Sequence, residues 1–251
     1  LANTDFMGTV ATTVAPVVNF TLGLKPTKTV MDAVLKVDKH RTFPKYASKT
    51  FEKWYKKNVA AFQNSFPRHV SMFHGCYVNY NYPQLGKDLV SVMNALGYGV
   101  HLLENEKCCG TALISNGMID QAKRNAANNI ESMRKSVYER QMPVISTSSS
   151  CTFTMRDEYP HLLGVKNEDV RDYIELATRF IYKLIDQDKV KLVFKKGYKA
   201  KVAYHTPCHM ERLGWGIFST ELIKMIPGVE LTVLDSNCCG IAGTYGFKKE
   251  N

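Results

Sequence analysis

The sequence predicts an α/β protein made of two repeated Rossmann-like βαβ cysteine-rich units, the second of them truncated, behind a helical N-terminal segment. Two stretches of the chain repeat the same order of motifs, which indicates duplicated architecture. Short apolar runs alternate with amphipathic helical stretches, which indicates a parallel sheet. Cysteines follow the strand-like runs in both repeats, so the site is expected to be duplicated with the fold.

Residues 1–67 are predicted to form a helical, basic segment that faces a membrane or a partner. Residues 6–24 carry no charged side chain, and their length approaches that of a membrane-spanning helix. Four threonines, two glycines, an asparagine and a proline make this stretch too polar and too broken for a predicted spanning helix. From Lys25 to Lys57, ten lysines or arginines stand against three acids, so most of the net charge of +10 is local.

This uncharged segment, followed by a basic one with aromatic side chains, fits a helix pair lying on an anionic membrane surface. Packing of the uncharged stretch on the protein's own core or on a partner subunit fits equally well. No charged n-region precedes the apolar run and no Ala-x-Ala site follows it, which argues against a secretory signal. The basic stretch has no nucleic-acid-binding signature, so we predict no nucleic-acid partner.

Residues 68–164 are predicted to form the first cysteine-rich unit, in the order strand, helix, strand, helix, strand. The predicted strands are 70–73, 100–103 and 144–146. Apolar residues share one face of a predicted helix at 84–96, which Gly97 ends, and a second helix is predicted at 119–138. This order predicts parallel strands that end at one common edge of the sheet.

Residues 165–200 are predicted to connect the two units. A strongly periodic apolar pattern predicts one helix at 169–185, and the basic, glycine-containing residues 195–199 are the expected linker. Residues 201–251 repeat the first unit in shorter form. Their predicted elements are a strand at 202–205, a helix at 218–225 and a strand at 231–234.

Six of the seven cysteines fall into two sets with the same order. In each set a single cysteine follows one strand-like run and a Cys-Cys-Gly motif follows the next, with gaps of 31 and 29 residues. The first set is Cys76, Cys108 and Cys109, and the second set is Cys208, Cys238 and Cys239. Each gap is about the length of one helix with its loops, so the chain returns to the same sheet edge and brings another thiol there.

The vicinal pairs argue against structural disulfides. Neighbouring Cα atoms lie about 3.8 Å apart, below the roughly 4.4 Å lower limit of ordinary disulfide geometry. The number of cysteines is odd, and a chain of 251 residues with 45% apolar and 22% charged residues can bury a core without covalent cross-links. These features favour a reducing compartment and thiols kept for metal or redox chemistry.

Adjacent thiolates favour an iron-sulfur cluster over zinc. They cannot both reach one tetrahedral ion without distorting the backbone, but they can bind different irons of one cluster. Cys151 lies 42 residues beyond Cys109, after the third predicted strand, and gives the first set a fourth possible ligand. The same offset from Cys239 falls beyond Asn251, so the second set is expected to be cut off by the end of the chain.

Three histidines lie near the cysteines. His74 and His205 occupy equivalent places before the first cysteine of each repeat. Either could orient a ligand loop or donate to a cluster sulfur, although a hydrogen bond to a strand-end carbonyl is the commoner role. His209 has no counterpart in the first repeat and is a candidate for a quinone or proton contact.

The chain resembles the cysteine-rich CCG domain family, whose pattern is Cys, about thirty residues, Cys-Cys-Gly, about forty residues and a closing Cys-x-x-Cys motif. Its members usually carry the domain in tandem in electron-transfer subunits, such as those of heterodisulfide reductases. More specifically, the chain resembles the family of C subunits of bacterial anaerobic glycerol-3-phosphate dehydrogenases over essentially its whole length. The motifs that carry this resemblance are FHGCYVNYN at 73–81, KCCG at 107–110, HTPCHME at 205–211 and CCGIAGTYGFKKEN at 238–251.

The resemblance implies a non-catalytic iron-sulfur subunit of an oxidoreductase complex in anaerobic respiration. Such a subunit accepts electrons from flavin-bearing catalytic subunits and passes them to menaquinone, as a peripheral protein on the cytoplasmic face of the inner membrane. All seven cysteines are the implied ligands of iron-sulfur clusters, of the 4Fe-4S type. We find no catalytic constellation and no dinucleotide fingerprint, so no turnover by this chain alone is expected.

The sequence departs from the family pattern in three places. It starts at Leu1 without a ferredoxin-like Cys-x-x-Cys-x-x-Cys run, and it ends at Asn251 before the closing Cys-x-x-Cys of the second repeat. Ser148 stands where the first thiol of the first closing motif would be, so this half is expected to hold a four-cysteine cluster or none. We therefore expect the chain to be a fragment of a longer polypeptide.

Two other classes of function fit the cysteines. One is a thiol/disulfide reductase or a zinc-bearing structural subunit of a related CCG-domain oxidoreductase, in which the first vicinal pair exchanges with a disulfide or binds zinc. The other is a non-redox scaffold whose cysteines are small buried apolar residues. The repetition of vicinal pairs at matched spacing argues against the scaffold, and iron content separates the first two.

Overall fold

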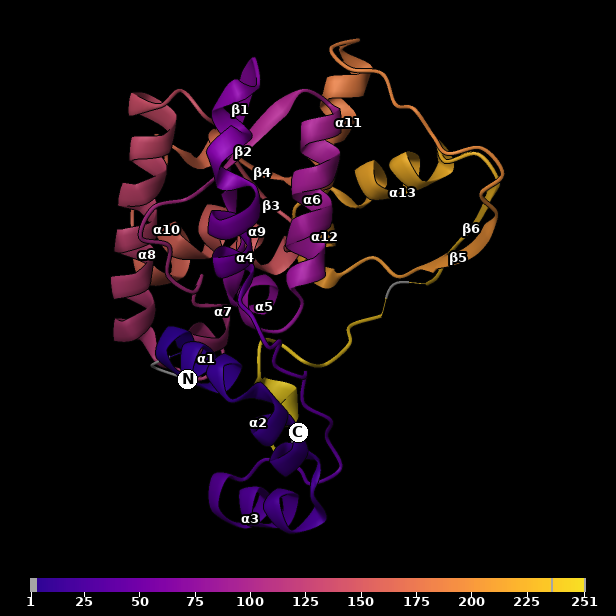
Figure 1. The fold of residues 1–251 in the computed structure, drawn as a ribbon. Coiled ribbons are helices and arrows are strands. Elements are labelled where there is room, and N and C mark those ends of the chain that lie inside the picture. The colour runs from indigo at the N-terminus through magenta and orange to yellow at the C-terminus, as the bar shows by residue number, and fades with distance from the viewer. Residues whose placement is uncertain (1–3, 236, 251) are drawn as a thin grey trace.

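A four-stranded parallel sheet forms the centre of the protein in the computed structural model, which describes residues 4–235 and 237–250 (Figure 1). The strands are β1 (Arg68–Phe73), β2 (Tyr98–Leu102), β3 (Val144–Ser146) and β4 (Ile174–Leu176). Their order in the sheet is β2-β1-β3-β4. This arrangement confirms the predicted α/β class with a parallel sheet, and the three strands predicted in the first unit are all present.

The first strand, β1, pairs with β2 on one side and with β3 on the other. The chain therefore changes its direction of winding at β1, and the carboxyl ends of three strands lie next to one another there. In open parallel sheets, ligands collect at such a switch point. Side chains on β1 alternate between two cores, with Met72 in one and Phe73 in the other, and both are fully buried.

Helices cover both faces of this sheet, and Figure 1 shows α8 and α10 on one side with α6 and α11 on the other. The helices of the first unit are α5 (Gly75–Tyr80), α6 (Pro83–Ala95), α7 (Thr111–Ile114), α8 (Ile119–Arg134), α9 (Ser149–Phe153) and α10 (Tyr159–Leu163). π-helical turns at Lys135–Glu139 and Thr154–Glu158 extend α8 and α9. The helices predicted at 84–96 and 119–138 are thus confirmed, within the usual uncertainty of element ends.

The single helix predicted at 169–185 is wrong in its first half. The structure has a 3₁₀ turn at Arg171–Tyr173, then β4, and only then α11 (Ala177–Asp186). Ile174 and Leu176 are buried, and their spacing from the apolar residues of α11 happens to continue a helical period. Pairing with β3 decides the outcome, a long-range contact that periodicity cannot reveal.

The second unit contributes a separate two-stranded parallel sheet, β5 (Ala200–Tyr204) with β6 (Val229–Val233). Its helices are α12 (Cys208–Arg212) and α13 (Gly216–Lys224), followed by a 3₁₀ turn at Tyr245–Phe247. The predicted strands and helix of this unit are confirmed. A small core of Leu176, Met210 and Trp215 joins the unit to the first sheet. The domain limits at 67, 164 and 200 stay predictions.

The N-terminal segment is helical, as predicted. It contains α1 (Thr4–Thr13), α2 (Ala15–Gly23), α3 (Lys25–Leu35), α4 (Phe51–Asn58) and a 3₁₀ helix at Ala60–Ser65. Within residues 4–235 and 237–250, no single helix has the length and apolar character needed to cross a membrane. The pair α1 and α2 meets these criteria together but is bent by 100°.

Contacts from distant parts of the chain hold the N-terminal helices. The ring of Tyr80 lies so close to Gly8 that a Cβ on Gly8 would be 2.5 Å from a ring atom, so α1 packs directly on α5. At the other end of the segment, Asp32 on α3 forms an ion pair with Lys249 at 2.6 Å. The C-terminal residues thereby lie against α3, as Figure 1 shows.

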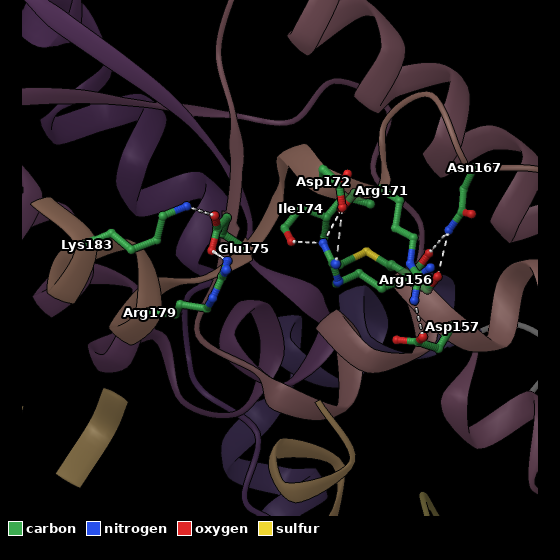
Figure 2. Close-up of polar contacts among 10 residues, drawn as sticks. Arg156, Asp157, Asn167, Arg171, Asp172, Ile174, Glu175, Arg179 and Lys183 are labelled. Atoms are coloured by element: carbon green, nitrogen blue, oxygen red, sulfur yellow. Dashed lines mark hydrogen bonds and ion pairs between the residues drawn. The ribbon is translucent and has the colours of Figure 1, made fainter. Parts of the chain in front are cut away.

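A buried carboxylate on β4 orders the edge of the sheet. Figure 2 shows Glu175 between Arg179 and Lys183, with Lys183 Nζ 2.7 Å from a Glu175 carboxylate oxygen. Glu175 is 4% exposed. Removing one partner of a buried charge pair costs more than the pair contributes net, because the other charges lose their counter-ion.

We expect Glu175→Gln to lower the free energy of unfolding by about 1–3 kcal/mol, because two cations lose the carboxylate while the side-chain volume is kept. Urea unfolding followed by circular dichroism measures this change. Glu221→Gln is the matched control, since Glu221 forms an exposed pair with Lys224 at 2.7 Å. The control should stay within about 0.5 kcal/mol of the parent protein. Equal stability of both variants would contradict a structural role for Glu175.

Candidate functional site

Four thiols meet at the carboxyl edge of the central sheet. Cys76 lies in α5 after β1, Cys108 and Cys109 lie in the loop after β2, and Cys151 lies in α9 after β3. The sulfur atoms of Cys108 and Cys76 are 3.9 Å apart. The Cys109 thiol also interacts with the thiols of Cys108 and Cys151, since each of these pairs shifts the pKa of both its members. The structure therefore brings together the four cysteines that the sequence assigned to the first set.

Local backbone geometry positions these thiols. Gly75 has a φ of +71° directly before Cys76, and a Cβ at Gly75 would lie 3.4 Å from the sulfur of Cys151. A glycine therefore allows both the left-handed turn and the close approach of the two cysteine segments. Ser148, in the place of a possible thiol, caps α9 by accepting a hydrogen bond from the Cys151 N–H at 3.2 Å.

Polar side chains hold the backbone of the vicinal pair, and sequence reasoning missed them. Asn129 of α8 accepts from the Lys107 N–H at 2.8 Å and donates to the Lys107 carbonyl at 3.0 Å. Asn125, one turn earlier, donates to the Cys108 carbonyl at 3.1 Å. Tyr159 of α10 donates to the Cys109 carbonyl at 2.9 Å.

Buried backbone carbonyls are costly without partners, so these three side chains fix the loop. A signal was present in the sequence, because two asparagines four residues apart lie on the buried face of the helix predicted at 119–138.

The pKa values of Cys108, Cys109 and Cys151 are shifted in different directions. Hydrogen bonds from the Cys108 and Cys151 thiols, together with one from Thr111, hold the pKa of Cys109 well below its usual value. Hydrogen bonding to Cys109 and burial raise the pKa of Cys151, and hydrogen bonding to Cys109 and Cys76 raises that of Cys108. Cys109 is therefore the first of the three to ionise, and the thiolate is the form that binds metals.

A cavity of about 640 Å³ opens beside Cys76. Glu106 lies at its wall, where its carboxylate accepts the N–H groups of His74 at 3.0 Å and Gly75 at 2.7 Å. Burial raises the pKa of Glu106 to about 7. His74 Nδ1 lies 3.2 Å from Glu106 and 3.1 Å from the Gly75 carbonyl, so His74 has a carboxylate partner that sequence reasoning missed.

The N-terminal helix α1 also reaches this site. The Cys108 N–H donates to the Asp5 carboxylate at 3.4 Å, and Asp5 lines the same cavity. No sequence signal identified this contact, since the two residues are 103 positions apart.

The second cysteine set is less buried. Cys208 begins α12 and is half-buried, whereas Cys238 and Cys239 are exposed. Burial, followed by the nearby Cys238, raises the pKa of Cys208. His205 Nε2 lies 2.7 Å from the carbonyl of Asn237, directly before the vicinal pair. This carbonyl lies in the loop after β6, not at the end of a strand as expected for this histidine.

The donor set of the first site suits an iron-sulfur cluster in its chemistry. Four thiols form a continuous group joined by pairwise contacts, and three of them are buried. Thiolates at positions fixed by the fold are the ligands that such clusters require. Among residues 4–235 and 237–250, no group of three or more His, Cys, Asp or Glu side chains is placed to hold a single metal ion.

Comparison with known proteins identifies relatives of both cysteine units. The family model described as "CCG: Cysteine-rich domain" matches residues 70–156 and 202–251. Over all 251 residues the chain is 55% identical to the C subunit of the anaerobic glycerol-3-phosphate dehydrogenase of Escherichia coli (strain K12), and it spans 63% of that protein's length.

More distant relatives match about 70% of the chain. "Lactate utilization protein A" of Bacillus velezensis is 34% identical over 188 residues, which cover 71% of this chain and 75% of the relative. "Uncharacterized iron-sulfur protein MJ0092" of Methanocaldococcus jannaschii is 30% identical over 176 residues, which cover 69% of this chain and 32% of the relative.

We expect Tyr159→Phe to raise the rate of alkylation of Cys109 in the metal-free protein by about tenfold. The change leaves the buried Cys109 carbonyl without its donor, a cost of about 1–3 kcal/mol that loosens the loop. Labelling with iodoacetamide, read by peptide mass spectrometry, measures this rate. Tyr138→Phe is the control, because Tyr138 donates to the Asp169 carbonyl at 2.7 Å on the exposed surface. Equal labelling in both variants would show that Tyr159 does not hold the loop.

Proposed function

The chain belongs to the family of proteins with the cysteine-rich CCG domain, and on this basis we propose that it is an electron-transfer part of an oxidoreductase complex. The observation that carries this proposal is the meeting of four thiols at the switch point of the sheet. Such a group of thiols suits one-electron transfer through a bound cluster.

We assign Cys76, Cys108, Cys109 and Cys151 as ligands of an iron-sulfur cluster of the 4Fe-4S type. Cys208, Cys238 and Cys239 contribute in the same way to a second cluster. When bound, the cluster accepts and donates single electrons. The protein's part is to keep the vicinal pair in place through Asn125, Asn129 and Tyr159, and to keep water from three of the thiols.

We propose flavin-bearing catalytic subunits of a glycerol-3-phosphate dehydrogenase as the electron donor. Support comes from the E. coli relative, which is 55% identical to this chain and is named as one subunit of such a dehydrogenase. The proposed acceptor is menaquinone in the inner membrane. In this role the chain is a non-catalytic subunit, and substrate oxidation takes place on its partners.

We further propose peripheral attachment to the cytoplasmic face of the membrane through α1, α2 and α3. Large apolar side chains on these helices and at the break between α1 and α2 are exposed, namely Phe6, Met7, Val10, Val14, Val17, Phe20, Val30, Val34 and Leu35. An apolar surface of this extent beside lysines of the basic stretch suits an anionic leaflet. Docking of a partner subunit on the same helices is the competing interpretation.

Thiol-disulfide exchange is a second candidate function, favoured by the lowered pKa of Cys109. A disulfide substrate would need to reach this sulfur. Cys109 is 4% exposed, so access argues for the cluster instead.

We expect the double variant Cys108→Ser and Cys109→Ser, made in the full-length protein and purified without oxygen, to lose the iron and acid-labile sulfide of the first set. Serine oxygen is a poor cluster ligand, and two of four ligands are removed. Iron, sulfide and zinc analysis with an EPR spectrum measures the loss. The matched control is Cys238→Ser with Cys239→Ser, which should keep the first-set signal. Zinc in place of iron, or iron unchanged by the first double variant, would refute the assignment.

We expect Phe6→Ser with Phe20→Ser to weaken binding to anionic lipid vesicles by at least about tenfold for each side chain, because burial of a phenyl group contributes about 1.5–3 kcal/mol. The two side chains are 68% and 69% exposed, so folding should be little affected. Co-sedimentation with vesicles measures the affinity. Tyr198→Ser, an exposed aromatic outside α1–α3, serves as control. Unchanged vesicle binding would leave partner docking as the role of these helices.

A further inference from the structure

The second cysteine set touches the first through neighbouring residues. His209 directly follows Cys208, and Ser150 directly precedes Cys151. His209 Nδ1 lies 2.9 Å from Ser150 Oγ. The imidazole also stacks on Phe153, with ring centroids 4.9 Å apart and planes 12° from parallel. The helices α12 and α9 are thus joined beside one thiol of each set.

A second contact joins the other ends of the two sets. Asn116, which follows α7, donates to Thr244 Oγ1 at 2.8 Å. A Cβ on Gly243 would lie 3.0 Å from the Cα of Ala112, so this loop packs closely on α7. The helix α7 follows the first Cys-Cys-Gly motif, and the loop follows the second. The helix α12 and the loop after the second Cys-Cys-Gly motif are therefore both held against the first unit.

Trp215 stabilises the position of α12 against the first unit. It is 9% exposed and packs with Met210 and Leu176. Arg179 and Arg156 lie over its ring, at 4.4 Å and 5.0 Å from the centroid. Figure 2 shows how Glu175 holds Arg179 in place. Arg179 is restrained because it stacks on the Trp215 indole and pairs with the Glu175 carboxylate. The end of α12 and the start of α13, which lie on either side of Trp215 in the chain, are restrained with it.

We propose that the two cysteine sets form one relay, and that His209 is the positioning residue that fixes the helix α12, which begins at Cys208, on the helix α9, which carries Cys151. The inference rests on the proposed electron-transfer function. The path from Cys208 to Cys151 runs through the neighbouring residue His209, across its hydrogen bond to Ser150, and on to Cys151, the next residue in the chain. In the transfer, one centre is oxidised by one electron and the other is reduced by one, and no proton or covalent bond changes hands.

His209 positions the helix α12 and is not itself a cluster ligand in this proposal. Its Nδ1 faces Ser150 and its ring faces Phe153, and Arg212 lies 5.8 Å from the Phe153 centroid on the same helix as His209. Electron-transfer rates fall steeply with the separation of the centres. A small shift of α12 relative to α9 therefore slows the relay while leaving the ligands of both sets intact.

The test uses the full-length protein, purified without oxygen and partly reduced, in four forms. These are the parent, His209→Ala, Ser150→Ala and His161→Ala, the last a control in an exposed histidine of α10. Iron and sulfide analysis shows whether both sets are loaded. The magnetic interaction between the two centres, seen as splitting or broadening in EPR, reports their separation.

We expect the parent and His161→Ala to show this interaction, and His209→Ala and Ser150→Ala to show a weaker one at unchanged iron content. An interaction of parental strength in His209→Ala, at the same iron content, would overturn the inference and leave the proposed function standing.

Amide hydrogen exchange supplies a readout that does not depend on a cluster. Loss of the His209 contacts should speed exchange in Cys208–Arg212 by up to about tenfold, with β1 unaffected, because one net hydrogen bond is worth about 0.5–1.5 kcal/mol. If the parent protein holds no iron, the proposed electron-transfer function fails on its own account. The exchange of α12 then still decides the positioning role, and unchanged exchange in His209→Ala refutes it.

Discussion

The place of β1 between β2 and β3 is the constraint on which the site depends. Parallel pairing on both sides aligns the carboxyl ends of three strands, and each is followed by a cysteine segment. Because β1 is buried on both faces, its register with its neighbours is strongly specified. Three chain segments, separated by whole helices, therefore deliver their thiols to one edge without any covalent link between them.

Bringing thiols together in a buried edge also buries the backbone that carries them. The loop that carries the vicinal pair lies beyond the end of β2, so pairing between strands does not satisfy its carbonyls. Asn125, Asn129 and Tyr159 make those hydrogen bonds from α8 and α10. Burial disfavours charged thiolates, and hydrogen bonds from the neighbouring thiols lower the pKa of Cys109, so Cys109 ionises before Cys108 and Cys151. Burial of the loop therefore determines both the hydrogen bonds that its backbone needs and the ionisation of its thiols.

Sequence patterns predicted what local periodicity and spacing control. The strands before Cys76 and Cys151, and the meeting of the four thiols, follow from apolar runs and helix-length gaps. What they missed depends on contacts between distant residues. The strand at Ile174–Leu176 exists because β3 offers an edge, and Asp5 reaches Cys108 only because α1 folds back on α5. Neither the pairing of β4 with β3 nor the contact of Asp5 with Cys108 can be predicted from the neighbouring sequence.

The helix α1 links the site to the protein's apolar surface. One face of α1 packs on α5, where Gly8 meets Tyr80, and Asp5 contacts the Cys108 N–H. The outward residues Phe6 and Met7 are exposed. An α-helix with its side chains is about 10 Å across. Any surface that covers α1, whether lipid or protein, is therefore held about one helix diameter from the vicinal cysteines, a short separation that suits the proposed electron transfer.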